Sequence, residues 1–148
     1  MANIHNAPFG IETVKKILPH RDPFLFIDHV ELVDDQKIQA SYQINEGHEV
    51  FKGHFPGNPV WPGVLQVEGL AQAAGVLGMW TSEEITDIPF LAKIEKTRFK
   101  LPVMPGSKIV YEVELIKKRH PYYWFEGKAL VNGSVVSEVA VSAKMETV

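Results

Sequence analysis

Two residues that can carry protons stand close together in the middle of the chain. His54 belongs to a turn-forming segment, GHFPGNP, and Glu68 is the single acid of the apolar stretch over residues 64–80. The imidazole of histidine changes charge near neutral pH and accepts protons readily. A carboxyl group among apolar neighbours tends to stay protonated, because burial disfavours its charged form. The pair is a candidate base and acid, although a loop histidine and a buried glutamate are by themselves more often structural.

The apolar stretch predicts a long buried helix over residues 62–80. Pro62 suits the first helical turn, where its missing N–H is not needed. Apolar and small residues cover almost every face, which is typical of a helix enclosed by other elements. The polar side chains within it, Gln66, Glu68 and Gln72, would be costly in lipid, so we expect no membrane span.

Three other residues of this helix can assist the acid. Gln72 lies four residues after Glu68 on the same helical face, so its amide can orient the carboxyl group. Gly63 and Val64 lie in the first turn, where backbone N–H groups have no partner within the helix. These N–H groups and the helix dipole favour a negative charge that develops on a substrate oxygen.

The remaining elements are predicted to be one short helix and several antiparallel strands. Asn132-Gly133 is the strongest hairpin signal of the chain. One long buried helix with five or six antiparallel strands predicts an α+β fold, in which the sheet curls around the helix. The predicted elements are a helix over residues 11–18, a hairpin over 24–33 and 37–44, a shaped loop over 45–61, and strands over 90–101, 108–116, 122–131 and 134–145.

Composition narrows the class of protein. The chain has 148 residues, 45% of them hydrophobic and 22% charged, which suits a single domain over residues 1–148. A formal net charge of -3 gives no general attraction to nucleic acid. The absence of cysteine excludes disulfides and thiolate chemistry. The N-terminal residues lack the basic and apolar regions of a secretion signal, so we expect a cytoplasmic location. His5, His29 and His120 show no metal-ligand spacing, so no metal site is expected.

Three segments carry a resemblance to a known family: ILPHRDPFLFIDHV, GHFPGNPVWPGVLQVEGLAQAAG and TRFKLPVMPG. In order and separation they resemble the 3-hydroxyacyl-acyl-carrier-protein dehydratases of dissociated (type II) bacterial fatty acid synthesis. The resemblance runs from about Ile11 to the last predicted strand. It implies a hot-dog fold, a homodimer or a trimer of dimers, no cofactor, and a partner in acyl carrier protein that bears the 3-hydroxyacyl thioester.

The resemblance also implies roles for the two proton carriers. His54 would be the base that removes the C2 proton, and Glu68 the acid that protonates the leaving 3-hydroxyl group. His54 of one subunit would work with Glu68 of the other, and the product would be a trans-2-enoyl thioester. A hot-dog acyl thioesterase and a non-catalytic acyl-binding module remain alternatives. Double-bond isomerisation is disfavoured, because the sister family that performs it resembles this one but carries aspartate at the acid position.

Two positions depart from the family pattern. Trp61 stands where Met, Phe or Ile is more common, and Gly69 where Ala is common. Trp61 precedes the helix at the point where an acyl chain would enter, so it is a candidate for lining the acyl tunnel. The alternative is an aromatic side chain that only packs in the core or at an interface.

A basic strip and three further polar residues complete the candidates. Lys96, Arg98 and Lys100 alternate along one strand, so their common face could steer an acidic carrier protein, with an ordinary solvated face as the alternative. A weaker basic candidate is the turn at Lys117, Lys118 and Arg119. We expect His20 to hold a loop by hydrogen bonds, His48 to be a weaker candidate base, and Asp28 to be structural.

Overall fold

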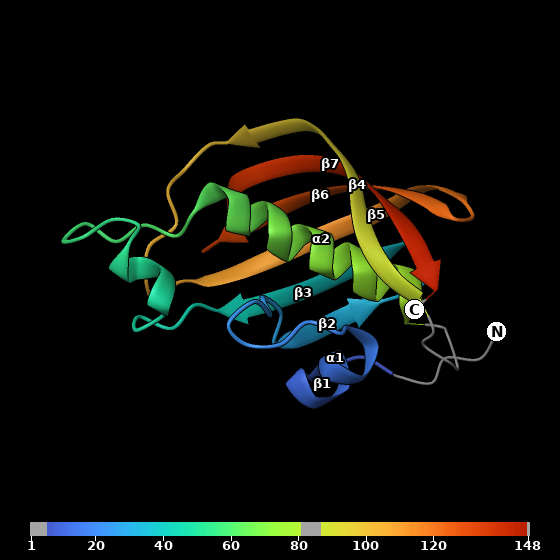
Figure 1. Ribbon diagram of the computed structural model, residues 1–148, viewed down its shortest axis with the longest axis horizontal. Helices are drawn as coiled ribbons and strands as arrows, with labels where there is room; N and C mark the ends of the chain where they lie inside the picture. The colour runs from blue at the N-terminus through green and yellow to red at the C-terminus, as the bar shows by residue number, and fades with distance from the viewer. Residues whose placement is uncertain (1–5, 81–86, 148) are drawn as a thin grey trace.

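The computed structural model describes residues 6–80 and 87–147 of the chain. Within these residues seven strands form one antiparallel sheet in the order β1-β2-β3-β5-β6-β7-β4. Two α-helices and one 3₁₀ helix accompany the sheet (Figure 1). The elements are β1 (Phe9–Gly10), α1 (Ile11–Ile17), β2 (His29–Val33), β3 (Lys37–Gln43), η1 (Glu49–Lys52), α2 (Gly63–Met79), β4 (Asp87–Phe99), β5 (Lys108–Arg119), β6 (Tyr122–Val131) and β7 (Ser134–Thr147).

The helix α2 lies in the hollow of the curved sheet (Figure 1). Its buried residues include Val67, Leu70, Val76 and Leu77, which occupy different faces of the helix. A helix that is apolar on several faces must be enclosed, and the sheet encloses it on the sides that solvent would otherwise reach. This arrangement confirms the expected α+β hot-dog fold.

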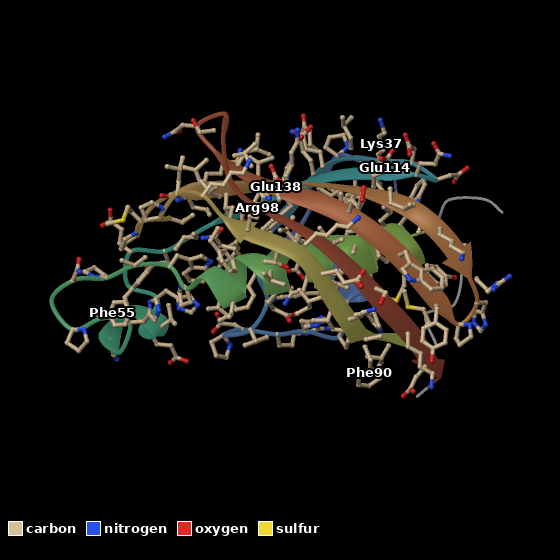
Figure 2. The ribbon with its side chains drawn as sticks, turned by 90° about the horizontal axis from the view of Figure 1, so that it is seen from above. Lys37, Phe55, Phe90, Arg98, Glu114 and Glu138 are labelled. Carbon is tan, nitrogen blue, oxygen red and sulfur yellow. The ribbon has the colours of Figure 1, made fainter. Side chains whose placement is uncertain are left out.

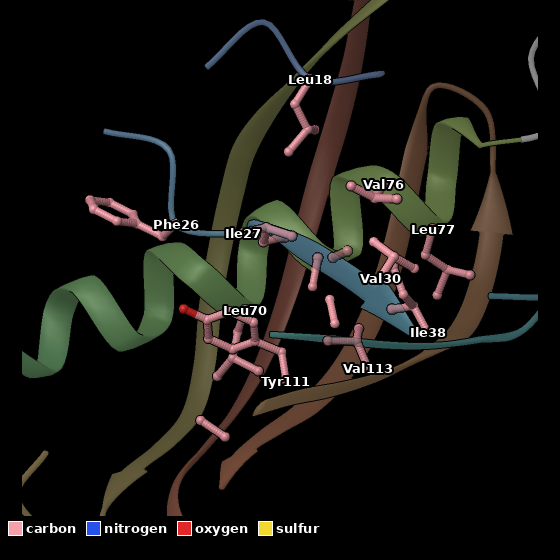
Figure 3. Packing of buried hydrophobic residues seen from close by; sticks show 14 of the residues in the cluster. Leu18, Phe26, Ile27, Val30, Ile38, Leu70, Val76, Leu77, Tyr111 and Val113 are labelled. Carbon is pink, nitrogen blue, oxygen red and sulfur yellow. The ribbon is translucent and has the colours of Figure 1, made fainter. Parts of the chain in front are cut away.

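The sheet supplies the rest of the core through alternation along its strands. On β5, Ile109, Tyr111 and Val113 are buried, whereas Glu114 on the opposite face is exposed. Successive side chains of a strand point to opposite faces, so one face packs on α2 and the other faces outward. Figure 3 shows Tyr111 and Val113 packed with residues of α2 and β2.

The predicted hairpin differs from the observed one at its first strand. The sequence predicts extended pairing from residue 24, whereas β2 begins at His29. The backbone of Phe24 and Phe26 instead bonds to the side chain of Gln72, on α2. A polar side chain therefore replaces a neighbouring strand as the hydrogen-bond partner of this segment.

The strand β4 forms one edge of the sheet, paired with β7 on one side only. It carries two irregularities, between Leu91 and Lys93 and between Glu95 and Arg98. Phe90, which is 50% exposed, projects outward at this edge (Figure 2). Leu91 and Ile94 are also exposed. An apolar edge strand is an open template for pairing with another chain.

Candidate active site

Glu68 projects from the middle of α2 and has one oxygen held by a neighbour. The amide nitrogen Nε2 of Gln72, one turn further along the helix, donates a hydrogen bond of 2.9 Å to Oε2 of Glu68. This is the contact that the four-residue spacing predicts. The carboxyl group is less buried than the sequence suggests, because 24% of its side-chain surface is exposed in the single chain. Apolar neighbours along the helix therefore do not enclose it by themselves.

Gln72 is fully buried and connects the helix to the segment before β2. Its Oε1 accepts from the backbone N–H of Phe26 at 2.8 Å, and its Nε2 also donates to the carbonyl of Phe24 at 2.9 Å. The amide cannot be turned round without placing its oxygen against two other oxygens. Its orientation is thus fixed, and so is the oxygen of Glu68 that it contacts.

His20 reaches the same carboxyl group from the loop after α1. Its Nε2 lies 3.7 Å from Oε2 of Glu68. Burial lowers the pKa of His20. The negative charge of Glu68 partly offsets this effect by raising the pKa, and the positive charge of Arg21 lowers the pKa further. This contact was not predicted from the sequence, where its one signal is the position of His20 between a proline and an arginine at a helix end.

Arg21, rather than His20, holds this loop by hydrogen bonds. Its Nη1 donates to the carbonyls of Leu18 at 2.8 Å and of His20 at 2.6 Å, and its Nη2 donates to the carbonyl of Lys15 at 3.0 Å. The expectation that His20 holds the loop is therefore wrong, since its ring forms no hydrogen bond with a described residue of the loop. The guanidinium group can do so because it offers several donors in a rigid fork.

A cavity of about 230 Å³ adjoins the carboxyl group of Glu68. Three polar side chains meet the cavity, those of Glu68, His20 and Gln72, and its other walls are almost entirely apolar. An apolar cavity with a few polar groups suits an acyl chain with a single reacting position. The apolar walls come from α2, β4, β7 and the loop before His20: Pro19, Ala71, Ala74, Ile88, Pro89, Phe90, Leu91, Val141 and Ala143.

His54 lies in the loop between η1 and α2, which extends beyond the N-terminal end of α2 (Figure 1). Its Nδ1 is 2.8 Å from the carbonyl oxygen of Val60, and its ring stacks on that of Phe55. A carbonyl only accepts, so Nδ1 carries the hydrogen in the neutral ring and Nε2 keeps a free lone pair. His54 is not among the described residues that line the cavity at Glu68, so in one chain this cavity holds the candidate acid without the candidate base.

The first turn of α2 offers free backbone donors. Among the described residues, no side chain caps the helix, and no acceptor is bonded to the N–H groups of Gly63 and Val64. A Cβ on residue 63 would lie 2.9 Å from the ring of Phe99, so this position requires glycine unless the ring shifts. The donors proposed for a substrate oxygen are therefore available.

Trp61 is packed in an aromatic cluster, away from the cavity at Glu68. It is 1% exposed, and its ring lies within 6.0 Å of the rings of Phe26, Tyr42, His48 and Phe51. It is not among the residues that line the cavity. These contacts favour the packing alternative, and a role for Trp61 in acyl-chain selection stays a prediction.

Asp28 and His48 both bond to the backbone. Oδ2 of Asp28 accepts from the N–H of Gln43 at 2.9 Å, which joins the start of β2 to the end of β3. Nδ1 of His48 accepts from the N–H of Val50 at 3.1 Å and caps η1. Both residues therefore have a structural role, and neither lines the cavity at Glu68.

The basic strip is less regular than the sequence predicts. Lys96 has a positive φ of 47° at the irregularity of β4, so the simple alternation with Arg98 is broken. Lys100 lies beyond the end of β4 and donates to Oε1 of Glu138 at 2.7 Å. Lys100 also holds the pKa of Glu138 below its usual value, with a smaller effect from Arg98. A carboxylate thus stands beside two of the three cations, Lys100 and Arg98, and Figure 2 shows it next to Arg98.

Residues 6–80 and 87–147 contain candidates for neither a metal site nor a membrane-spanning helix. No group of three or more His, Cys, Asp or Glu side chains in this part of the chain could hold a metal ion. None of its helices is long and apolar enough to cross a membrane.

An antiparallel sheet curved around one long helix is the hot-dog fold, so this chain is a hot-dog protein with an acid beside an apolar cavity. The chain belongs to the FabA-like domain family, whose model matches residues 18–140. One relative is the 3-hydroxyacyl-acyl-carrier-protein dehydratase FabZ of a Nitratiruptor species, 41% identical over 137 residues that cover 88% of this chain and 93% of the relative. The FabZ of Erythrobacter litoralis is 44% identical over 138 residues, 91% of each chain.

Solved structures share the fold at lower identity. The dehydratase heterocomplex ApeI:P from Xenorhabdus doucetiae has a TM-score of 0.80 at 20% identity, over 97% of this chain and 93% of that one. Thioesterase superfamily member 2 from Mus musculus has a TM-score of 0.60 at 12% identity, over 78% and 79% of the two chains. At these identities the likeness concerns the fold alone.

Proposed function

We propose that this protein dehydrates (3R)-3-hydroxyacyl groups on acyl carrier protein to trans-2-enoyl groups in fatty acid biosynthesis. The curated relatives are named for this activity, and their sequences align with about nine-tenths of the chain. One observation supports the assignment of catalytic roles: the carboxyl group of Glu68 lies beside an apolar cavity, and Gln72 binds one of its oxygens. His54 is the base, since its Nε2 keeps a free lone pair while Nδ1 donates to Val60.

The chemistry needs three groups and no redox step. Nε2 of His54 takes the C2 proton, and the electron pair of that C–H bond forms the C2–C3 double bond. The C3–O bond breaks, and Glu68 gives its proton to the departing hydroxyl group, which leaves as water. Negative charge that develops on the thioester oxygen is stabilised by the N–H groups of Gly63 and Val64.

The active site is shared between two copies of the chain in this proposal. The cavity at Glu68 is walled by β4 residues from Ile88 to Leu91, and β4 is the sheet edge that exposes Phe90 and Ile94. A second copy paired along β4 would stand beside the cavity and could bring its own His54 loop to it. Pairing would also cover the carboxyl group of Glu68, which the single chain leaves partly exposed. The choice between a dimer and a trimer of dimers stays open.

The partner and the location are parts of the same proposal. Acyl carrier protein delivers the substrate, and Lys96, Arg98 and Lys100 are its candidate docking residues. Opposite charges at an interface chiefly raise the rate of association. A cytoplasmic location stays a prediction.

The deciding experiment follows two products from one substrate panel. The protein is incubated with 3-hydroxyacyl carrier proteins of several chain lengths, and mass spectrometry follows enoyl formation while a thiol reagent follows free carrier protein. We expect enoyl product without thiol release. Thiol release without enoyl product would favour the hot-dog thioesterase, and binding without either product would favour the acyl-binding module.

Variants of the two proton carriers test the assigned roles. His54→Ala and Glu68→Gln should each lower dehydration about 100-fold or more, because each removes a proton-transfer group. Glu31→Gln, an exposed acid on β2, is the control and should keep full activity. Near wild-type turnover in either active-site variant would refute the assignment of that residue.

A further inference from the structure

The two oxygens of the Glu68 carboxyl group have different surroundings. Oε2 accepts the hydrogen bond from Nε2 of Gln72 at 2.9 Å and lies 3.7 Å from Nε2 of His20. No described residue forms a hydrogen bond with Oε1. The protein therefore directs two nitrogen atoms from different elements to one oxygen and leaves the other oxygen free.

The loop that carries His20 is anchored on both sides of the contact. Arg21 binds the carbonyls of Leu18 and His20, and Gln72 binds the backbone of Phe24 and Phe26. The amide of Gln72 contacts both this segment and the carboxyl group of Glu68, so the position of the loop is fixed relative to the acid. A fixed frame of this kind is what precise placement of a reacting group requires.

The environment of His20 favours one neutral tautomer. Its Nδ1 is buried and has no hydrogen-bond partner among the described residues. A hydrogen on Nδ1 would leave a buried donor unpaired and would turn the lone pair of Nε2 toward Oε2 of Glu68. A hydrogen on Nε2 points instead at that oxygen. Burial also lowers the pKa of the ring, which favours the neutral form.

We propose that His20 is a positioning residue, which together with Gln72 occupies Oε2 of Glu68 so that the transferable proton is carried on Oε1. A proton on Oε2 would point at the N–H groups of Gln72 and His20 and would compete with them for that oxygen. A proton on Oε1 faces no N–H group of a described residue. The inference rests on the proposed role of Glu68 as the acid. At 3.7 Å the His20 contact is longer than a hydrogen bond, and contacts of this kind often shorten when substrate binds.

Two variants separate this role from simple packing. His20→Gln keeps an N–H donor near the place of Nε2, whereas His20→Phe keeps a planar ring without a donor. We expect His20→Phe to lower kcat about fivefold to tenfold with little change in KM, as for the loss of one hydrogen bond in the transition state. His20→Gln should recover most of that loss. The matched control is His29→Phe, which removes an exposed histidine that also faces a glutamate, Glu31, and should leave kcat unchanged.

Nuclear magnetic resonance gives a readout that does not depend on activity. Long-range ¹H–¹⁵N spectra of the wild type should show His20 as the Nε2–H tautomer. The Nδ1–H tautomer would overturn the proposal, as would a His20→Phe variant with wild-type kcat. If both His20 variants lost activity equally, the ring would be structural and the proposal would fail.

A double variant links the effect to Glu68. In the Glu68→Gln background, His20→Phe should cause no further loss, because its effect passes through the carboxyl proton. A further loss of the same size would show that His20 acts elsewhere and would refute the inference. If Glu68→Gln retained wild-type activity, the assignment of the acid and this inference would both fail. An inactive Glu68→Gln beside a fully active His20→Phe refutes the inference alone.

Discussion

The hydroxyl group of Tyr111 occupies the place where a Cβ on residue 69 would stand. Tyr111 lies on β5 and is completely buried, and its ring reaches α2 at Gly69 (Figure 3). Gly69 is one of the two departures from the family pattern, and this contact gives its physical reason. A residue with a Cβ at position 69 would overlap the tyrosine ring, so the two residues form a matched pair across the core.

Gly69→Ala is expected to destabilise the protein, although alanine is the better helix former. Overlap in a packed core costs about 1 to 3 kcal/mol. The overlap with the Tyr111 ring is severe, so we expect a cost in the upper part of that range, above the gain of about 1 kcal/mol from replacing glycine in a helix. Chemical denaturation measures the change in the free energy of unfolding. The control is Gly75→Ala on the same helix, where a Cβ would meet only side-chain atoms, at 3.2 Å and beyond, and should cost less.

The cost of Gly69→Ala should depend on the tyrosine. In a Tyr111→Leu background the obstructing ring is absent, so adding Gly69→Ala should cost less than it does in the wild type. Equal costs in the two backgrounds would show that the residues are not coupled.

Tyr111 should also make stability depend on pH in alkaline solution. Burial raises its pKa well above the usual 10.0, so the folded protein keeps a proton that the unfolded chain releases. The stabilisation that the protonated Tyr111 gives to the folded state is complete below pH 10.0. It is lost as the pH rises from the pKa of tyrosine in the unfolded chain to the higher pKa of Tyr111 in the folded protein. Tyr111→Phe should make the free energy of unfolding fall less steeply above that pH. Tyr122→Phe, at an exposed position, should leave the slope unchanged, and an unchanged slope in Tyr111→Phe would contradict the prediction.

Mixing two inactive variants should restore activity if the site is shared. A dimer of one His54→Ala subunit and one Glu68→Gln subunit has one site with both wild-type residues. Random exchange at equal amounts makes half of the dimers mixed, so about a quarter of wild-type activity should return. Mass spectrometry of differently labelled subunits verifies the exchange. Verified exchange without recovery would mean that each site belongs to one chain.

Trp61→Met is expected to act on stability rather than on chain-length preference. The indole is buried among four aromatic rings, so its removal should lower the free energy of unfolding by about 2 to 4 kcal/mol. Relative rates among acyl lengths should stay the same, because Trp61 does not line the cavity at Glu68. A shift in those relative rates with unchanged stability would support the tunnel role instead.

Charge reversal of Lys96 and Arg98 should slow the turnover of carrier-protein substrates. The expected change is in kcat/KM, with small thioester mimics nearly unaffected and with added salt weakening the wild type in the same way. Lys100 is left unchanged, because it donates a hydrogen bond to Glu138. Arg98 also faces Glu138 across the β4–β7 pair, so the free energy of unfolding of the variant is measured beside its activity. Reversal of Lys16 and Lys108, two exposed lysines outside both basic candidates, changes the net charge equally and is the control. Equal losses on both substrate types would show that the strip acts on the fold.

The sequence by itself predicted the central helix and the hairpin between the last two strands, and it singled out His54 and Glu68 as the candidate base and acid. Apolar residues on every face of the stretch around Glu68 required an enclosing sheet, and Asn132-Gly133 required a turn between two strands. The Glu68–Gln72 contact was also predictable, since neighbours four residues apart on a helix meet whatever the rest of the fold does. Each of these conclusions depends on local spacing.

Only the tertiary structure decided the contacts between distant segments. His20 meets Glu68 because the Gln72 amide fastens the segment before β2 to the helix, across more than forty residues of chain. Tyr111 meets Gly69 because β5 crosses below α2 at that turn. Burial of Trp61 among rings from separate segments arises in the same way. Periodicity shows which face of an element is apolar, but which residue of another element lies against that face is set by strand order and by close packing of the whole core.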